Sequence, residues 1–409
     1  MKTKSKIPAL RFKGFTDAWE QRRLGEVTIY QNGKGYEDSQ SSSGKFELIN
    51  LNSISIDGGL KSSGKYIESA DKTLLTDDLV MVLSDVGKGD LLGRVAIIPK
   101  DNYYVLNQRV ALIRPKNKQQ TNYLFSYINS HQRYFKLHGA GMSQLNISKG
   151  SVENFPLLLP SLPEQQQIGT FFAHLDTLIS LHQRKCDQTK ELKKTMLQKM
   201  FPKKGETVPE IRFPEFTDAW EECKLGEVGN TFTGLSGKTK EDFGHGEGKF
   251  ITYMNVFSNP VADLDGLEGV EIDNKQFQVK AGDVLFTTSS ETPEEVGMSS
   301  MWLGNADNIY LNSFCFGYRP TIEFDNYYLA FMFRSAPIRK KFQLLAQGIS
   351  RYNISKNKVM EMSIPVPSIE EQEKIGSFFK HLDDTIALHQ RKLDLLKEQK
   401  KGFLQKMFV

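Results

Sequence analysis

The sequence predicts an α+β protein with two globular bodies in tandem pseudo-repeat, separated by two long helices that form an antiparallel coiled coil. Three observations predict this fold. A charged segment with a heptad pattern occurs twice, a shorter segment in front of each body also occurs twice, and the intervening stretches carry short apolar runs and glycine-rich turns. Self-similarity over most of a chain indicates a duplicated unit.

The heptad segments are residues 164–201 and 371–408, which align at an offset of 207 with 25 of 38 positions identical. Their apolar residues alternate steps of four and three, the 3.5-residue period of two helices that wind around each other. Because a whole folded body joins them, we expect the helices to pair antiparallel. The predicted seam comprises Ile168, Phe172, Leu175, Ile179 and His182 in the first copy, and Ile375, Phe379, Leu382, Ile386, His389, Leu393 and Leu396 in the second.

Polar residues interrupt the seam at the same places in both copies. His182 recurs as His389, and Lys193 recurs as Lys400. A polar seam residue fixes the register of a coiled coil at some cost in stability. A metal or proton site is the alternative, but the sequence around each histidine lacks a carboxylate or cysteine at ligand spacing. We therefore interpret these positions as register determinants and predict that the chain binds no metal.

A lead segment stands in front of each body. Residues 7–27 and 208–228 align at an offset of 201 and share the block Phe-Thr-Asp-Ala-Trp-Glu, at 15–20 and 216–221. The whole chain is therefore a tandem duplication. We assign residues 1–162 to a first body with its lead segment, 163–201 to the first long helix, 202–369 to a linker and a second body, and 370–409 to the second long helix.

The bodies align only loosely, at offsets near 205. Shared landmarks predict strands at Asp78-Leu79-Val80 and Asp283-Val284-Leu285, and strands that end on Arg114-Pro115 and Arg319-Pro320. We expect helices near 121–137 and 326–346 and extended strands at 155–160 and 363–367. The long helices diverged less than the bodies, which suits a common frame that holds two different heads.

Composition restricts the function classes. The net charge of +4 permits nucleic-acid binding through local patches but does not demand it. Three cysteines without motif spacing argue for a reducing compartment, so we expect a cytoplasmic protein. We expect no signal peptide, because no apolar run follows the basic residues 1–6, and no membrane span, because apolar runs are short.

The sequence contains only incomplete matches to catalytic motifs. The stretch 232–239 ends in Gly-Lys-Thr, but Phe232 stands where a phosphate loop needs its first glycine, so we interpret it as a turn with an exposed Lys238. Asp394 with residues 398–400 resembles a nuclease motif, but on a coiled-coil helix we interpret these residues as solvated charges. An adenine methyltransferase would need a glycine-rich cofactor loop and an Asn-Pro-Pro-aromatic block, which the sequence lacks. We predict a non-catalytic chain.

Polar loops recur in both bodies and suit contact with duplex DNA, where polar side chains read base edges and Lys or Arg bind phosphates. The alternative is ordinary surface loops, and recurrence of the loops 141–149 and 348–356 raises the case for function. The candidates in the first body are Lys34, Tyr36, Ser84, Lys88, Arg94, Asn107, Gln108, Arg109, Ser143, Gln144, Asn146 and Lys149. Those in the second are Lys238, Lys240, Thr287, Thr288, Ser289, Asn312, Ser350, Arg351, Tyr352, Asn353 and Lys356.

With these motifs the chain resembles the specificity subunit of type I restriction–modification enzymes. The residues that carry the resemblance are the repeated lead blocks 15–27 and 216–228, and the Pro-x-x-x-x-Gln start of each long helix, at Pro160 to Gln165 and Pro367 to Gln372. The resemblance covers essentially the full length. It implies that each body reads one half of an asymmetric, bipartite sequence in double-stranded DNA, and that the helices space the halves.

The same resemblance implies partners and cofactors. Two methyltransferase subunits would dock on the helices and bodies, bind S-adenosylmethionine, and methylate adenine at N6 after flipping it from the stack. Restriction subunits would use ATP and Mg to make an endonuclease. This chain itself would hold no cofactor. The alternative from another class is a non-catalytic coiled-coil scaffold that binds proteins only.

Overall fold

A computed structural model of the chain describes residues 7–86 and 88–408. Residues 1–6, on which the expectation about a signal peptide partly rests, lie outside the described residues. The chain divides into two units, each of which is described by itself. Unit 1 comprises residues 1–182 with 391–409, and unit 2 comprises residues 183–390. Each unit therefore contains one body and segments of both long helices, α5 (Leu162–Lys199) and α10 (Ile369–Met407).

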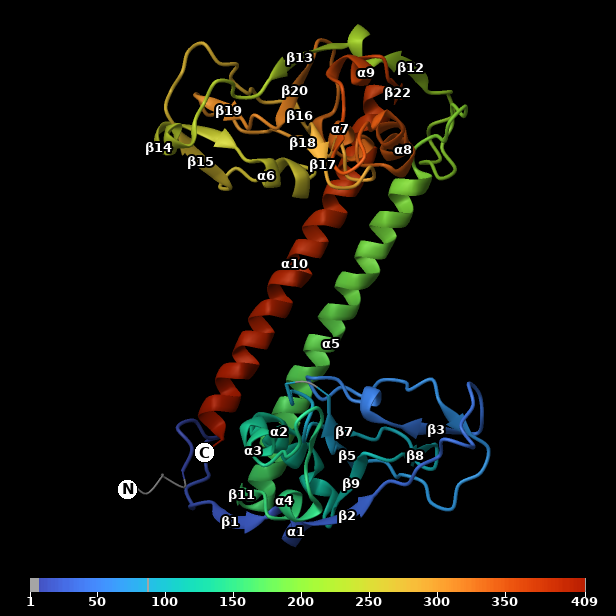
Figure 1. Cartoon of the computed structure of the whole chain (residues 1–409), viewed down its shortest axis with the longest axis vertical. Coiled ribbons are helices and arrows are strands. Elements are labelled where there is room, and N and C mark those ends of the chain that lie inside the picture. The colour runs from blue at the N-terminus through green and yellow to red at the C-terminus, as the bar shows by residue number, and fades with distance from the viewer. Residues whose placement is uncertain (1–6, 87, 409) are drawn as a thin grey trace. The chain divides into compact units, whose positions relative to one another are not determined.

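Unit 1 carries short strands and helices in the body (Figure 1). They are β1 (Glu20–Arg23), α1 (Leu24–Val27), β2 (Thr28–Asn32), β3 (Phe46–Ile49), η1 (Leu51–Ser53), β4 (Tyr66–Ile67), β5 (Leu79–Val82), β6 (Ser84–Asp85), β7 (Val95–Ile97), β8 (Tyr104–Leu106), β9 (Val110–Pro115), η2 (Lys118–Gln120), α2 (Thr121–Ser130), α3 (Gln132–Leu137), β10 (Leu145–Asn146), α4 (Lys149–Glu153) and β11 (Pro156–Leu159).

Unit 2 repeats this order with local differences. Its body contains β12 (Glu221–Lys224), η3 (Leu225–Glu227), β13 (Gly229–Thr233), η4 (Lys240–Asp242), β14 (Phe243–Ile251), α6 (Tyr253–Ser258), β15 (Leu267–Val270), β16 (Val284–Thr287), β17 (Ser289–Ser290), β18 (Ser299–Met301), β19 (Ile309–Leu311), β20 (Cys315–Pro320), α7 (Asn326–Met332), α8 (Ala336–Leu345), β21 (Tyr352–Asn353), α9 (Lys356–Met360) and β22 (Ser363–Val366).

The sheets of the two units have the same topology. Unit 1 has a four-stranded sheet in the order β2-β9-β5-β7, and unit 2 has β13-β20-β16-β18. Each unit adds a three-stranded sheet, β4-β3-β8 or β15-β14-β19, and two two-stranded ladders, β1-β11 with β10-β6 or β12-β22 with β17-β21. The predicted α+β class is confirmed.

Alternation along β5 explains how the four-stranded sheet is buried. Leu79 and Met81 belong to the core that includes α2 and the long helices, whereas Val80 and Val82 belong to a second core beneath the three-stranded sheet. Because successive side chains of a strand point to opposite faces, an uninterrupted apolar run marks a strand buried on both faces.

The long helices pair antiparallel within each unit. In unit 1, Phe172 stacks on Phe408 at 5.6 Å between ring centroids, and the ammonium of Lys400 binds the carboxylate of Asp176 at 2.5 Å. In unit 2, Phe201 stacks on Phe379 at 6.0 Å, and Lys193 binds Asp383 at 2.5 Å. As residue numbers increase along α5, the residue numbers of the partners on α10 decrease, which confirms the predicted antiparallel pairing.

Every seam residue named from the sequence is buried or half-buried. The two polar lysines of the seam each meet an aspartate of the other helix, and both pairs are largely shielded, with exposed side-chain fractions of 17–35%. A slip by one heptad would separate both pairs and leave buried charge behind. The ion pairs therefore favour one register. His182 and His389 are half-buried along the same seam.

The helices expected near 121–137 and 326–346 are each broken in two, which corrects the prediction. The first breaks at His131, whose backbone leaves the helical region between α2 and α3. The second breaks at Ser335, which is the N-cap of α8 and precedes a proline in its first turn. Proline lacks an N–H and fits only in the first turn of a helix, so this proline marks the start of a second helix. The apolar pattern continues across the break, and therefore the sequence alone predicted one helix.

A buried ion pair fastens each lead segment to the start of a long helix. Glu164 is fully buried and accepts two hydrogen bonds from the guanidinium of Arg11, at 2.6 and 2.8 Å. Glu371 is 1% exposed and accepts from Arg212 at 2.7 and 2.8 Å. Such bidentate pairs are short and directional, and they compensate a carboxylate that would otherwise be strongly destabilised by burial.

The repeated Pro-x-x-x-x-Gln motif has a related structural role. The amide of Gln165 donates to the carbonyl of Pro160 at 2.8 Å, and that of Gln372 donates to Pro367 at 3.0 Å. Both glutamines are buried. The motif therefore joins the residue that follows the last strand of the body to the first turn of the long helix.

We expect Arg11→Met to lower the free energy of unfolding by about 3 kcal/mol, because it leaves the buried Glu164 carboxylate without its partner. Thermal or urea unfolding followed by circular dichroism measures the change. Arg22→Met is the matched control, since the pair between Arg22 and Glu20 lies in solvent and contributes below about 0.5 kcal/mol. Equal effects of the two substitutions would contradict the role assigned to Glu164.

Candidate nucleic-acid interface

The recognition edge of unit 1 is the end of the four-stranded sheet where β2 and β5 finish and β9 begins. The strand register places Asn32 opposite Ala111 and Val82 opposite Val110. Because these strands are antiparallel neighbours, the loops that follow β2 and β5 and the loop that precedes β9 leave the sheet at the same end. Three of the candidate loops, at residues 33–36, 84–94 and 107–109, are thereby brought together.

Backbone hydrogen bonds join the fourth loop to this edge. The N–H of Leu83 donates to the carbonyl of Arg109, and the N–H of Ile147 donates to the carbonyl of Leu83, both at 2.9 Å. Ser84 pairs with Asn146 in the short β6–β10 ladder, where its hydroxyl also donates to the Asn146 side chain. Lys34 and Asn107 form a parallel bridge at the other side. The recognition edge is thus one connected surface.

Unit 2 builds its recognition edge in the same way. β13 and β16 finish and β20 begins at one end of the sheet, with Thr233 opposite Phe316 and Thr287 opposite Cys315. The N–H of Thr288 donates to Phe314, and the N–H of Ile354 donates to Thr288, both at 2.9 Å. The β17–β21 ladder pairs residues 289–290 with 352–353. The loops near 234–240, 288–290, 312–314 and 348–353 therefore converge.

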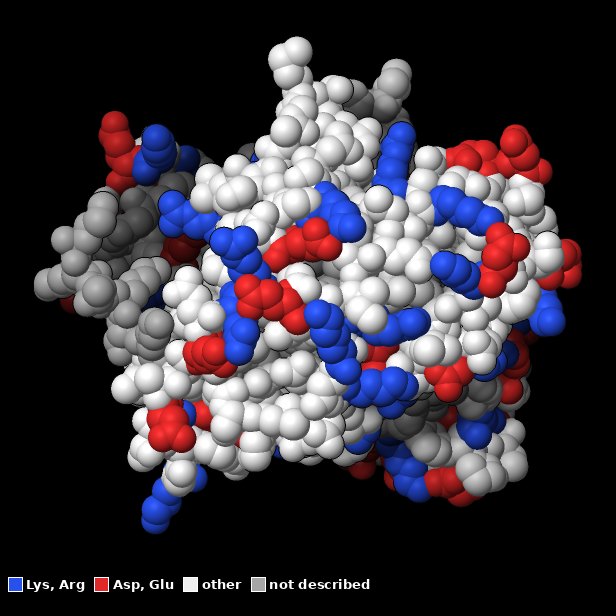
Figure 2. Space-filling view, turned by 90° about the horizontal axis from the view of Figure 1, so that it is seen from below, with Lys and Arg blue, Asp and Glu red and all other residues white. Residues whose placement is uncertain are grey.

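Several candidate cations are exposed at these edges, including Lys88, Arg109, Lys240 and Arg351. Others are paired: the ammonium of Lys34 lies 2.7 Å from Asp71 and 5.1 Å from the Tyr36 ring, and its hydrogen bond to Asp71 raises the pKa of Lys34. Figure 2 views unit 1 and shows Lys and Arg side chains interspersed with Asp and Glu. Any attraction of a polyanion is therefore local, in keeping with the small net charge.

The structure places other candidates inside the protein. Thr287 is fully buried, and its hydroxyl accepts the N–H of Met298 at 3.0 Å. Ser84 and Ser289 are 4% exposed. Asn107 and Asn312 use their side-chain oxygens to accept the N–H groups of Gln108 and Phe314, at 2.8 and 2.9 Å. These side chains shape the loops rather than offer free surface.

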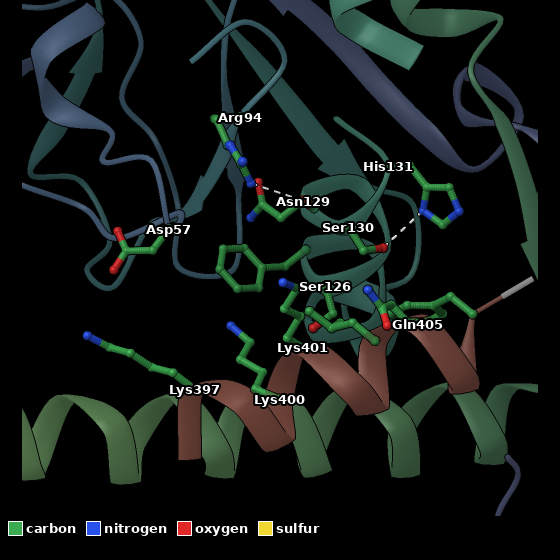
Figure 3. A pocket seen from close by; sticks show the side chains of 13 residues that line it. Asp57, Arg94, Ser126, Asn129, Ser130, His131, Lys397, Lys400, Lys401 and Gln405 are labelled. Atoms are coloured by element: carbon green, nitrogen blue, oxygen red, sulfur yellow. Dashed lines mark hydrogen bonds between the residues drawn. The ribbon is translucent and has the colours of Figure 1, made fainter. Parts of the chain in front are cut away.

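Two further candidates differ from expectation. Lys238, predicted to be exposed, has a side chain 13% exposed and lies 3.2 Å from the carboxylate of Asp273, so the prediction of an exposed lysine is wrong. Arg94 does not reach the loop tips. It points into a cleft beside α10, where its guanidinium donates to the carbonyl of Asn129 at 3.0 Å (Figure 3). Burial lowers the pKa of Arg94.

The remaining candidates lie on the loops that form the edges. Lys149 begins α4, 3.6 Å from Glu153 and 5.5 Å above the Tyr30 ring. Gln144 donates to the Asn146 side chain at 3.4 Å. Tyr352 and Lys356 are half-buried, whereas Ser143, Ser350 and Asn353 are exposed. Arg351 also donates to the hydroxyl of Ser289 at 3.3 Å.

Sequence reasoning missed the two most exposed apolar side chains of the recognition edges. Met142 is 106% exposed and Ile349 is 95% exposed, at equivalent places in the two repeated loops. Each follows a glycine with positive φ, Gly141 at 132° and Gly348 at 142°. The bridges Ala140–Asn146 and Gln347–Asn353 close both loops. The apolar residue that follows the shared glycine in both loops was the sequence feature that could have indicated these two positions.

The described residues give little support for chemistry at these edges. Among them, no group of three or more His, Cys, Asp or Glu side chains is placed to hold a metal ion. Cys315 is buried, and burial raises the pKa of its thiol, which disfavours the thiolate needed of a nucleophile.

Within residues 7–86 and 88–408, no helix has both the length and the apolarity that a membrane span requires.

Comparison with known proteins identifies the family. Residues 16–191 and 217–398 match the type I restriction modification DNA specificity domain, once in each half of the chain. The chain belongs to this family. The family is one of DNA-binding specificity subunits, a non-catalytic class, and the expectation drawn from the lead blocks and the helix starts is confirmed.

Similar proteins match this chain over nearly its full length. The type I restriction enzyme MjaVIII specificity subunit of Methanocaldococcus jannaschii is 22% identical, over 94% of this chain and 91% of that protein. The S subunit of a type I restriction-modification system from M. genitalium has a similar fold, with a TM-score of 0.58 and 15% identity over 98% of this chain and 99% of that one. A chain from work on complex assembly and conformational transition of the type I R-M system gives 0.51 at 18% identity, over 97% of this chain and 99% of that one.

In this member of the specificity family, the loop geometry of unit 2 predicts a sensitive position. In Gly348→Ala the new Cβ would lie 2.0 Å from the carbonyl oxygen of Arg351, at a φ that L residues rarely adopt. We expect a local cost of about 1–3 kcal/mol. Hydrogen exchange should accelerate at the amides of Gln347 and Asn353, which bond each other's carbonyls at 2.9 and 2.8 Å.

The matched control is Gly402→Ala, because that glycine lies in α10 with nothing within 4 Å of the added Cβ. It should leave the loop unchanged and stabilise the helix by up to about 1 kcal/mol. Unchanged exchange at Gln347 and Asn353 in the Gly348 variant would contradict the expectation that the bridge between them depends on Gly348.

Proposed function

We propose that this chain gives a type I restriction–modification complex its DNA sequence specificity, with each recognition edge reading one half of a bipartite, asymmetric target in double-stranded DNA. The single observation that carries the proposal is the recognition edge, which the same strand topology builds twice from different side chains. Equal geometry with unequal side chains is what two different half-sites would require, since base-edge contacts depend on side-chain chemistry.

The long helices have the role of a spacer in this proposal. A coiled coil with one favoured register keeps a defined length, and the ion pairs of Lys193 and Lys400 support that register. We expect half-site centres about 34 Å apart, one helical turn of DNA, or somewhat more. The recognition domains of this proposal are residues 1–162 and 202–369, and the spacer helices are 163–201 and 370–409.

Chemistry would belong to the partners. Two methyltransferase subunits would bind S-adenosylmethionine and methylate adenine at N6, and restriction subunits would use ATP and Mg. The chain itself would hold no cofactor and act on DNA in the cytoplasm. A candidate set for DNA contact is the exposed group at the two edges: Lys88, Gln108, Arg109, Met142, Ser143, Asn146, Lys149, Lys240, Ile349, Ser350, Arg351 and Asn353.

We expect one bipartite methylation motif in a host that expresses this chain with its methyltransferase subunit, measured by methylome sequencing. Replacing residues 28–160 with another body should change one half of the motif and leave the other intact, because each edge is built within its own unit. A short continuous motif, or a change in both halves together, would contradict the proposal. A complex without sequence preference in a salt-titrated binding assay would favour a scaffold that binds proteins only.

Met142 and Ile349 give the sharpest test of the recognition edges. Exposed apolar side chains contact thymine methyl groups or insert between base steps. We expect Met142→Ala to relax one position in one half-site by about 1–3 kcal/mol, and Ile349→Ala to do the same in the other half-site. Binding of the assembled methyltransferase complex to single-substituted duplexes measures the change.

Two controls separate this effect from others. Ile322→Ala removes a side chain that is also exposed, at 47%, but follows the end of β20 opposite the recognition edge, and should change neither half-site. Lys149→Ala should weaken all sequences alike and reduce the salt slope by about 1, as expected of a phosphate contact. Equal motifs for the wild type and both apolar variants would remove Met142 and Ile349 from the interface.

A further inference from the structure

A short turn at the recognition edge, which we call the edge turn, connects β8 to β9 in unit 1 and β19 to β20 in unit 2. It comprises residues 107–109 and 312–314. The N–H of Leu83, just after β5, donates to the carbonyl of Arg109 at 2.9 Å. The N–H of Thr288, just after β16, donates to the carbonyl of Phe314 at 2.9 Å. Because β5 and β16 correspond, Arg109 and Phe314 occupy the same backbone position in the two units.

Close packing fixes the edge turn in both units. A Cβ added to Gly33 would overlap the carbonyl oxygen of Asn107, and one added to Gly234 would overlap that of Asn312. The N–H groups of the two asparagines donate to the neighbouring strands β3 and β14, at 3.0 and 3.1 Å. A side chain carried by a turn that is held this closely is presented at a defined place, which discrimination between similar ligands requires.

Arg109 is exposed at the end of this turn in unit 1. None of the described residues forms a hydrogen bond or an ion pair with its guanidinium. Its φ is 65°, in the left-handed region that residues with a side chain rarely adopt. Such strain persists where the surrounding structure enforces it, and it is common at binding sites. An arginine that is strained, exposed and unpaired suits a role in binding rather than in packing.

Phe314 holds the same position in unit 2 and is 55% exposed. Its carbonyl accepts the N–H and the hydroxyl of Thr288, at 2.9 and 2.7 Å, and its N–H donates to the side chain of Asn312 at 2.9 Å. The guanidinium of Arg351 lies 5.7 Å from the ring centroid, within the range of a cation–π contact. These contacts hold an aromatic ring in solvent, where it is available to a partner.

The two side chains match different features of the major groove of DNA. The fork of an arginine matches the O6 and N7 acceptors of guanine, whereas an apolar side chain matches the methyl group of thymine. Arg109 has the first chemistry and Phe314 has the second. A neighbouring position differs in the same sense, because Gln144 in unit 1 corresponds to Arg351 in unit 2 at the repeat offset of 207. One backbone frame therefore presents two different sets of base-reading groups.

We propose that the last residue of the edge turn selects one base pair in each half-site. Arg109 binds the major-groove edge of a guanine, and Phe314 contacts the methyl group of a thymine. The inference rests on the proposed function for double-stranded DNA as the ligand, and on the equivalence of the two turns for the residues. A phosphate contact of Arg109 and insertion of Phe314 between base steps are the alternatives that the test separates.

The test of Arg109 uses the assembled methyltransferase complex and duplexes that carry the target found by methylome sequencing. Arg109→Ala should reduce discrimination at one G·C pair of the half-site read by unit 1 by roughly 5- to 150-fold. At that pair, 7-deazaguanine lacks the N7 acceptor, so it should weaken binding of the wild type and leave the alanine variant unaffected. Arg109→Lys keeps the charge but loses the fork, so it should lose discrimination with an unchanged salt slope.

The test of Phe314 replaces the contacted thymine with deoxyuridine, which removes only the methyl group. This replacement should weaken binding of the wild type about fourfold and have no effect on Phe314→Ala. Phe314→Arg should change the preferred pair at that position from T·A to G·C. Such a gain of a new preference cannot result from a folding defect.

The matched controls are Arg22→Ala and Ile322→Ala, which remove exposed side chains in β1 and beyond the end of β20, away from the recognition edges. Both should keep the wild-type motif. An unchanged motif with uniformly weaker binding and a salt slope smaller by about 1 in Arg109→Ala would indicate a phosphate contact and overturn the proposal for that residue.

A wild-type complex that is insensitive to deoxyuridine at every thymine would overturn the proposal for Phe314, and a unit 1 half-site without a G·C pair would overturn it for Arg109. In each of these cases an intact bipartite motif would leave the proposed function standing. A short continuous motif in the wild type would instead overturn the proposed function and this inference together.

Discussion

The buried carboxylates at the starts of the long helices, Glu164 and Glu371, are the constraint on which the frame of the molecule depends. A charge with almost no exposure requires a fixed, bidentate partner, and in each unit that partner comes from the lead segment, Arg11 or Arg212. The pair fixes where the chain enters the unit and where the helix begins. Around it lies an aromatic core that also receives the end of the other long helix, through Phe408 in unit 1 and Phe201 in unit 2.

A second pair of buried charges holds each four-stranded sheet. Asp78 binds Arg114 at 2.6 and 2.7 Å, and Asp283 binds Arg319 at 2.7 Å through both of its oxygens. These residues belong to the landmarks that align between the two bodies, whereas the loop residues at the recognition edges differ. The structure thus separates positions that build the sheet from positions that line its edge. The topology shared by the two units agrees with this division.

Charge has different roles in the frame and in the bodies. The pairs of Lys400 with Asp176 and of Lys193 with Asp383 are internal, and they stabilise one register of the helices. The nearby Arg94, Arg334 and Arg339 instead donate to main-chain carbonyls, and so join segments of the body to one another. The duplicated frame presents this arrangement twice, once in each unit.

The sequence by itself determined the duplication, the two long helices, the antiparallel seam and the α+β class, because repeats and heptad periodicity are local properties that survive in any tertiary context. It also named the loops that meet at the recognition edges. Only the tertiary structure decided which side chains those loops expose: it buried Thr287 and Ser84, paired Lys238 with Asp273, turned Arg94 toward α10, and left Met142 and Ile349 in solvent. Burial depends on strand register and on packing between segments far apart in the chain. Neither can be deduced from the residue types of a single loop.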